Sequence, residues 1–209
     1  MTPKTLFHYW RSSSSWRVRW ALELKGLKPE MVHVNLLDGE TETPAHLQRN
    51  PMGFVPVLEA SPGKYLIESV AILEFLEELV PSPQLYPGDA YKKAHIRSLV
   101  EIINSGIQPL QNLSTLDHYS EDEEKRKEWS RFFVKRGLHA YEDLCKKSAG
   151  KFSVGDEITA ADLFLIPQLY NALRIGLSLS DFRILEKINE NALATPAGKA
   201  SVPEKYKPS

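Results

Sequence analysis

The stretch Asn50–Leu58, which reads NPMGFVPVL, decides how the first part of the chain is organised. It leads into a strand, the turn-forming run Ser61–Lys64 follows, and Tyr65–Ile67 has the pattern of a second strand, so we expect a hairpin. Two interpretations of the Val55–Pro56 bond remain open. A cis bond turns the Val55 backbone outward toward a peptide-like ligand, whereas a trans proline simply begins the strand.

The segments on either side of this hairpin extend it to a small α/β domain. Downstream, Ser69–Leu79 carries apolar residues at helical spacing, and Ser69 is placed to cap the helix. Upstream, Lys4–Tyr9 predicts a strand, Trp16–Lys25 a helix and Met31–Leu36 a second strand. We therefore expect a β-α-β unit followed by a β-β-α unit within residues 1–80.

The composition of the chain changes after this domain. Residues 81–88 contain three prolines and a glycine, which favours a linker. Helical periodicity dominates residues 89–209, so the fold class is α/β plus all-α. Within this second domain, Thr159 and Asp162 have the spacing of a capping box, and Cys145 lies on an apolar helical stripe that indicates a core position.

Charge and cysteine content exclude several classes of function. The 209 residues include 26 basic and 27 acidic side chains, which leave no basic footprint for nucleic acid or an anionic membrane. The N-terminal stretch lacks the apolar run of a signal peptide, which favours the cytoplasm. The six histidines show no metal-ligand spacing, so we expect no metal site. A small-molecule substrate is the better expectation.

Two polar stretches could carry chemistry. The four serines of RSSSSWRVR, Arg11–Arg19, precede a helix, where they can cap it or favour an anion such as a thiolate. Glu68 and Ser69 precede the next helix. They can serve as a simple cap, or they can hold the ammonium and carboxylate groups of an α-amino acid within one turn.

At this level of detail the sequence resembles the zeta class of glutathione transferases over nearly its whole length. The motifs that carry the resemblance are RSSSSWRVR at 11–19, NPMGFVP at 50–56, ES at 68–69, IQPLQNLS at 107–114, GDEITAADL at 155–163 and PQLYNALR at 167–174. The resemblance implies a glutathione transferase fold, with an N-terminal thioredoxin-like domain and a C-terminal helical domain. It also implies a homodimer and a glutathione site.

The resemblance also implies roles for individual residues. Ser12 matches the catalytic hydroxyl, which would hydrogen-bond the glutathione thiolate. Arg11 and Arg174 match arginines that bind the second substrate. The residues implied to bind glutathione are Ser12, Ser13, Ser14, Ser15, Val55, Glu68, Ser69, Gln108, Asn112 and Ser114. The chain departs from the family pattern at two of them, because Ser14 replaces a cysteine and Glu68 replaces a glutamine.

The reaction implied is a cis–trans isomerisation of maleylacetoacetate-type dicarboxylates, in which glutathione thiolate adds, a bond rotates and the thiolate leaves. One alternative keeps the same site but consumes glutathione, in transfer to small electrophiles or α-haloacids. A second alternative is a binding or interaction protein of the same fold that has lost turnover. The motifs do not separate the first two, since both depend on one thiolate.

Overall fold

The computed structural model describes residues 2–208, and the chain divides into two compact units. The N-terminal unit comprises Met1–Gln84 together with Thr195–Ser209, and the helical unit comprises Leu85–Ala194.

The N-terminal unit contains a four-stranded mixed sheet in the order β2-β1-β3-β4, with β1 parallel to β2 and antiparallel to β3. Its elements are β1 (Thr5–His8), α1 (Ser13–Leu24), β2 (Glu30–His33), η1 (Glu40–Glu42), α2 (Pro44–Arg49), β3 (Val57–Ser61), β4 (Lys64–Ile67), α3 (Ser69–Leu79), α9 (Pro196–Ser201) and η4 (Pro203–Tyr206). The hairpin and the β-α-β, β-β-α order are as predicted, and the α/β plus all-α fold class is confirmed.

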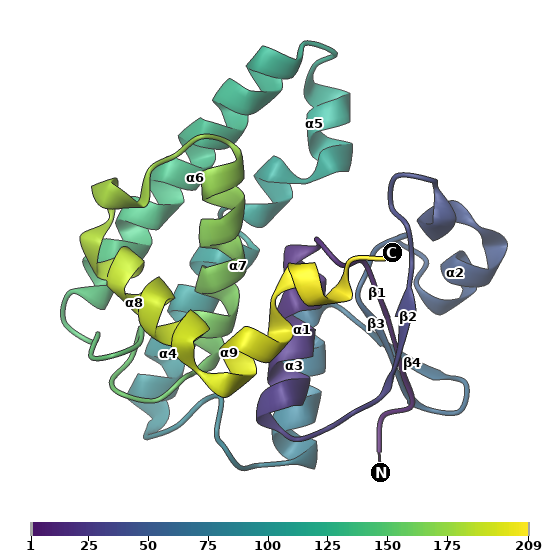
Figure 1. Cartoon of the computed structure of the whole chain (residues 1–209), viewed down its shortest axis with the longest axis horizontal. Helices are drawn as coiled ribbons and strands as arrows, with labels where there is room; N and C mark the ends of the chain where they lie inside the picture. Colours follow the sequence, from purple (N-terminus) through teal and green to yellow (C-terminus); the bar gives the residue numbers. More distant parts are fainter. Residues whose placement is uncertain (1, 209) are drawn as a thin grey trace. The chain divides into compact units, whose positions relative to one another are not determined.

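The two faces of the sheet are covered differently. Helices α1 and α3 pack together on one face, and α2 lies on the other (Figure 1). Alternation along β1 explains the division, because successive side chains of a strand point to opposite faces. Leu6 is fully buried, whereas the neighbouring Phe7 lies under the guanidinium of Arg49 at the end of α2, 4.2 Å from the ring centroid.

The last segment of the chain belongs to the N-terminal unit. The sequence predicted 89–209 as one helical domain, but contacts group the segment from Thr195 onward with the sheet and α1. Helix α9 packs against α1, and the Trp16 Nε1–H donates to Ser201 Oγ at 2.9 Å. The large Trp16 and Trp20 rings are buried in this region, and the burial of such rings favours the packing of α9 against α1.

The helical unit consists of α4 (Ala90–Asn104), η2 (Gln108–Gln111), α5 (Leu113–Tyr119), α6 (Glu123–Cys145), α7 (Ala160–Arg174), η3 (Leu179–Asp181) and α8 (Arg183–Ala194). The predicted capping box begins α7, where the Asp162 carboxylate accepts the Thr159 N–H at 2.8 Å. Among the described residues, no helix is both long and apolar enough to cross a membrane.

Candidate active site

Ser12 is the N-cap of α1. Its Oγ accepts the backbone N–H of Ser15 at 3.2 Å, and its own N–H donates to the Tyr9 carbonyl at 3.1 Å. The helix therefore begins at Ser13, three residues earlier than the sequence predicted, because Ser12 caps it and the other three serines form its first turn.

The geometry of this cap suits an anion. Ser12 is partly exposed, and because its Oγ accepts from Ser15 it retains its own O–H as a donor. The first-turn amides of α1 add a partial positive charge at the same place. A thiolate beside Ser12 would receive a charge-assisted hydrogen bond, which lowers the pKa of the corresponding thiol.

The neighbouring serines are not equivalent to Ser12. Ser15 is fully buried, and its Oγ accepts the Tyr9 N–H at 3.4 Å, so its side chain serves the turn before the helix. Ser13 is also buried, whereas Ser14 is partly exposed. Of the three, the Ser14 side chain is the more accessible to a ligand.

Val55 lies in the loop just before β3. The Val55–Pro56 bond is cis, which decides between the two interpretations left open by the sequence. The Val55 side chain clusters with Tyr9 and Val34, which places its backbone near the turn that leads to Ser12. Within residues 2–208, the Val55 N–H and C=O make no hydrogen bond, so both can pair with an extended ligand.

Glu68 and Ser69 begin α3 in an unusual way. Glu68 has φ 66° and ψ 119°, and it is the one non-glycine residue with positive φ among the described residues. Such a backbone costs about 1–3 kcal/mol, and strain of this kind clusters at functional sites. Ser69 is the first helical residue and not the cap that the sequence predicted, since the backbone turns at Glu68 instead.

Two buried arginines support this region, and the sequence assigned neither of them a role. Arg17 Nη1 donates to Ser69 Oγ at 3.1 Å, which links α1 to the start of α3. Arg19 Nη2 donates to the Trp10 carbonyl at 2.9 Å, and both guanidiniums are fully buried. The signal was present in the pattern WRVRW, because a helix with apolar residues on every side leaves its arginines inside.

The polar residues of η2 and α5 lie on a segment that other helices of the unit hold. Trp129 Nε1–H donates to the Leu110 carbonyl at 2.8 Å, and Gln111 Nε2 donates to Gln168 Oε1 at 2.6 Å. Gln108 begins η2, Asn112 joins it to α5, and Ser114 lies in the first turn of α5. Asn112 makes no side-chain capping bond and Ser114 is exposed, so both can meet a ligand.

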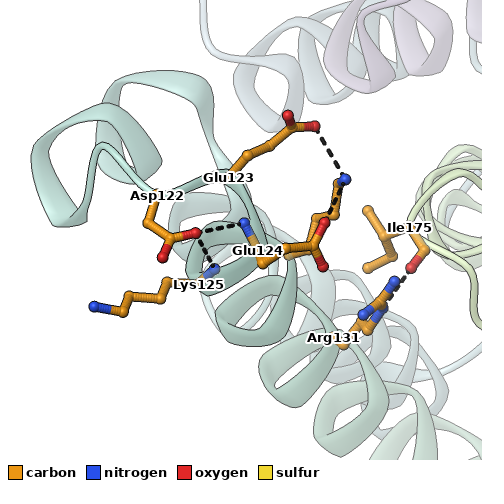
Figure 2. Close-up of polar contacts among 7 residues, drawn as sticks. Asp122, Glu123, Glu124, Lys125, Arg131 and Ile175 are labelled. Carbon is orange, nitrogen blue, oxygen red and sulfur yellow. Dashed lines mark hydrogen bonds and ion pairs between the residues drawn. The ribbon is translucent and has the colours of Figure 1, made fainter.

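Arg174 is the last residue of α7 and is exposed. The helix stops there because Gly176, at φ 83°, donates its N–H back to the Leu173 carbonyl at 3.0 Å. Arg131 on α6 fixes the same end, since its Nε donates to the Ile175 carbonyl at 2.7 Å (Figure 2). Arg174 therefore presents its charge from an anchored helix end.

Cys145 does not have the properties of a reactive thiol. It is fully buried at the end of α6, and burial raises the pKa of its thiol to about 12. A neutral, enclosed thiol is a poor nucleophile, which agrees with the core position that the sequence predicted. The described residues contain no cluster of three or more histidine, cysteine or carboxylate side chains suited to a metal.

Comparison with family models matches both parts of the chain. The model for the glutathione S-transferase N-terminal domain matches residues 2–78, and the model for the C-terminal domain matches residues 110–195.

Individual relatives match along nearly the whole chain. A probable maleylacetoacetate isomerase 2 of Drosophila melanogaster is 45% identical over 200 residues, which cover 95% of this chain and 87% of the relative. A zeta-class glutathione S-transferase of Euphorbia esula is 40% identical over 203 residues, covering 96% and 90% of the two chains.

Solved structures agree with these relatives. A maleylacetoacetate isomerase of Anaeromyxobacter dehalogenans 2CP-1, with glutathione bound in its active site, has a TM-score of 0.90 and 45% identity, covering 100% of this chain and 98% of its own. A second structure of that protein, with a TM-score of 0.89, 45% identity and coverage of 100% and 97%, holds dicarboxyethyl glutathione and citrate.

Proposed function

We propose that this chain, which belongs to the zeta class of the glutathione S-transferase family, is a glutathione-dependent cis–trans isomerase of maleylacetoacetate-type dicarboxylates. Glutathione is its thiol cofactor, and Ser12 is the proposed catalytic hydroxyl. The observation that supports Ser12 is its place at the start of α1, where it accepts from Ser15 and keeps its own proton for a ligand.

The reaction requires a thiolate and regenerates it. The thiol of glutathione releases its proton to solvent, and the Ser12 O–H donates to the resulting anion. The thiolate adds to the cis double bond, which forms a carbon–sulfur bond and an enolate. The former double bond is then single and rotates. When the enolate collapses, the carbon–sulfur bond breaks and the trans product and thiolate separate.

The remaining groups of the N-terminal unit suit the rest of glutathione. The unpaired Val55 N–H and C=O match the backbone of its cysteinyl residue, as one strand edge matches another. The exposed Glu68 carboxylate is the proposed partner of the γ-glutamyl ammonium, while Ser69 and the first-turn amides of α3 take the carboxylate. Ser13 and Ser14 line the thiol end in this proposal.

The second substrate is a dicarboxylate in this proposal, and its partners are the two arginines. Arg11 is partly exposed beside Ser12, and Arg174 is exposed at the end of α7. A guanidinium binds a carboxylate through two parallel hydrogen bonds and stabilises the charge of an enolate. We assign Gln108, Asn112 and Ser114 to glutathione because the family resemblance implies these roles. The polar and accessible positions of Asn112 and Ser114 agree with the assignment.

The experiment that tests this function follows glutathione itself. The protein is mixed with glutathione and maleylacetone, and the free thiol and the geometry of the product are measured over many turnovers. We expect a trans product with full recovery of the thiol. Loss of thiol in proportion to product would support the transferase alternative, and no reaction would support a binding protein.

We also propose a homodimer in the cytoplasm. The dimer follows from the family resemblance, and the mass in solution by light scattering tests it. The location follows from the chemistry, because the reaction needs glutathione as a thiol, which a reducing compartment maintains.

A further inference from the structure

The segment after α9 lies along α1 and the turn before it. Beyond the Trp16–Ser201 hydrogen bond, the Arg19 guanidinium lies 4.6 Å from the ring centroid of Tyr206. The Lys207 ammonium lies 5.7 Å from the ring centroid of Trp10. The end of the chain thus reaches the residues that immediately precede the proposed catalytic serine.

Arg19 connects this segment to the turn. Its Nη1 donates to the Tyr9 carbonyl at 3.3 Å and lies 3.2 Å from His8 Nδ1, and its Nη2 donates to the Trp10 carbonyl at 2.9 Å. Within residues 2–208 no carboxylate forms a direct ion pair with Arg19, although the Glu204 carboxylate acts on its charge at longer range. The buried charge is therefore held by two carbonyl oxygens, an imidazole nitrogen and the face of Tyr206.

The stability of the fold alone does not explain this arrangement. A buried charge without a direct ion pair carries a desolvation penalty that an apolar residue at the same place would avoid. The hydrogen bonds of Arg19 end on the backbone between β1 and α1, where Ser12 N–H closes the turn on the Tyr9 carbonyl. Movement of this turn would move the Ser12 hydroxyl.

We propose that Arg19 is a positioning residue for Ser12, and that Tyr206 holds the Arg19 guanidinium in place from the C-terminal segment. The proposal deepens the proposed function and rests on it, because Ser12 matters only if it meets glutathione. Displacement of a reacting group by about 1 Å can cost about a hundredfold in rate, so a clamp of this kind has a measurable effect.

The test uses substitutions at both members of the pair. Arg19→Lys keeps the charge but cannot span both carbonyls, Tyr206→Leu removes the ring, and Tyr206→Phe keeps it. We expect kcat with maleylacetone to fall about tenfold or more in Arg19→Lys and about threefold or more in Tyr206→Leu, with Tyr206→Phe near the wild type. Arg49→Met is the matched control, since it removes another close arginine–aromatic contact in the N-terminal unit, with Phe7, and we expect it to leave kcat unchanged.

A second readout separates positioning from stability. Ultraviolet titration of the thiolate gives the thiol pKa of bound glutathione, which we expect to rise in Arg19→Lys and Tyr206→Leu. Folded variants with unchanged kcat and unchanged thiol pKa would overturn the proposal, even if their melting temperatures fell. Tyr206→Phe as impaired as Tyr206→Leu would overturn the role of the ring, and the Tyr206 pair remains decisive if Arg19→Lys does not fold.

The two proposals fail in different ways. Wild-type protein that binds glutathione but does not isomerise maleylacetone refutes the proposed reaction. The titration of bound glutathione still measures the effect of Arg19 in that case.

Discussion

The starts of α1 and α7 are two capped helix ends with opposite uses. At α7 the Asp162 carboxylate is fully buried and accepts from the Ser153 and Thr159 N–H groups, both at 2.8 Å. At α1 the Ser12 hydroxyl accepts one N–H and remains partly exposed. The same capping chemistry contributes stability where protein groups satisfy it completely, and it offers a ligand site where one donor is left over.

Removal of the buried cap at the start of α7 should destabilise the protein most. Asp162→Ala leaves the Ser153 and Thr159 N–H groups buried without acceptors, and each such group costs about 1–3 kcal/mol. We expect the free energy of unfolding, measured in urea, to fall by about 3–5 kcal/mol. Turnover per folded molecule should not change.

A matched control lies at the start of α6. Asp122 caps that helix by accepting from the Glu124 and Lys125 N–H groups at 2.9 and 3.3 Å, and it is exposed (Figure 2). Asp122→Ala should cost only about 1 kcal/mol, because water replaces the lost bonds. Equal losses in the two variants would contradict the distinction between enclosed and open caps.

A substitution at Arg174, at the other end of α7, should change substrate binding and not the stability of the protein. Arg174→Ala removes an exposed cation, and charge-assisted hydrogen bonds contribute about 1.5–3 kcal/mol. We expect kcat/KM for a dicarboxylate to fall about 10- to 100-fold, with a much smaller loss for an uncharged electrophile. Equal losses for both substrates would remove the proposed role of Arg174.

The stability of the protein should depend on pH through the buried His8, at the end of β1. Burial, with Arg19 and His33 nearby, lowers the pKa of His8 from 6.5 to about 3, and the ring of Tyr206 packs against it. Between these values the unfolded chain binds a proton that the folded chain does not, so acidification favours unfolding.

We therefore expect the free energy of unfolding to fall by about 1–2 kcal/mol between pH 7 and pH 5 because of His8. His8→Asn, which keeps an acceptor for Arg19, should lose that part of the pH dependence in urea titrations. The exposed His118→Asn should keep it. An unchanged slope in His8→Asn would show that other groups set the acid sensitivity.

The smallest expected effect concerns the departure at Ser14. Ser14→Cys restores the family residue beside the open cap, and we expect glutathione affinity or turnover to rise about two- to tenfold, because a thiol makes a larger and more polarisable contact than a hydroxyl. Isothermal titration and initial rates measure the two quantities. No change in either would show that the substitution is silent.

The elements whose signals are local were predicted correctly. Apolar alternation and the turn at Ser61–Lys64 predicted the hairpin, and the spacing of Thr159 and Asp162 predicted the start of α7. The start of α1 was misplaced by three residues, because Ser13–Ser15 lack the apolar period on which the helix prediction depended.

Features that depend on tertiary contacts were not predictable in the same way. The positive φ of Glu68 was not predictable from the residue type, because this conformation is typical of glycine and not of glutamate. The return of the C-terminal segment to α1 depends on partners 185 residues apart, such as Trp16 and Ser201. The role proposed for Ser12 comes from family motifs, whereas the positions of Arg17 and Arg19 became informative only once their burial was known.

The most direct measurement is the thiol pKa of glutathione bound to the wild-type protein and to Ser12→Ala, by ultraviolet titration of the thiolate. A free thiol of this kind has a pKa near 8.5. We predict a clearly lower pKa in the wild type and a return toward the free value in Ser12→Ala, while glutathione still binds. Identical pKa values in the two proteins would contradict the role of the open helix cap in activating glutathione.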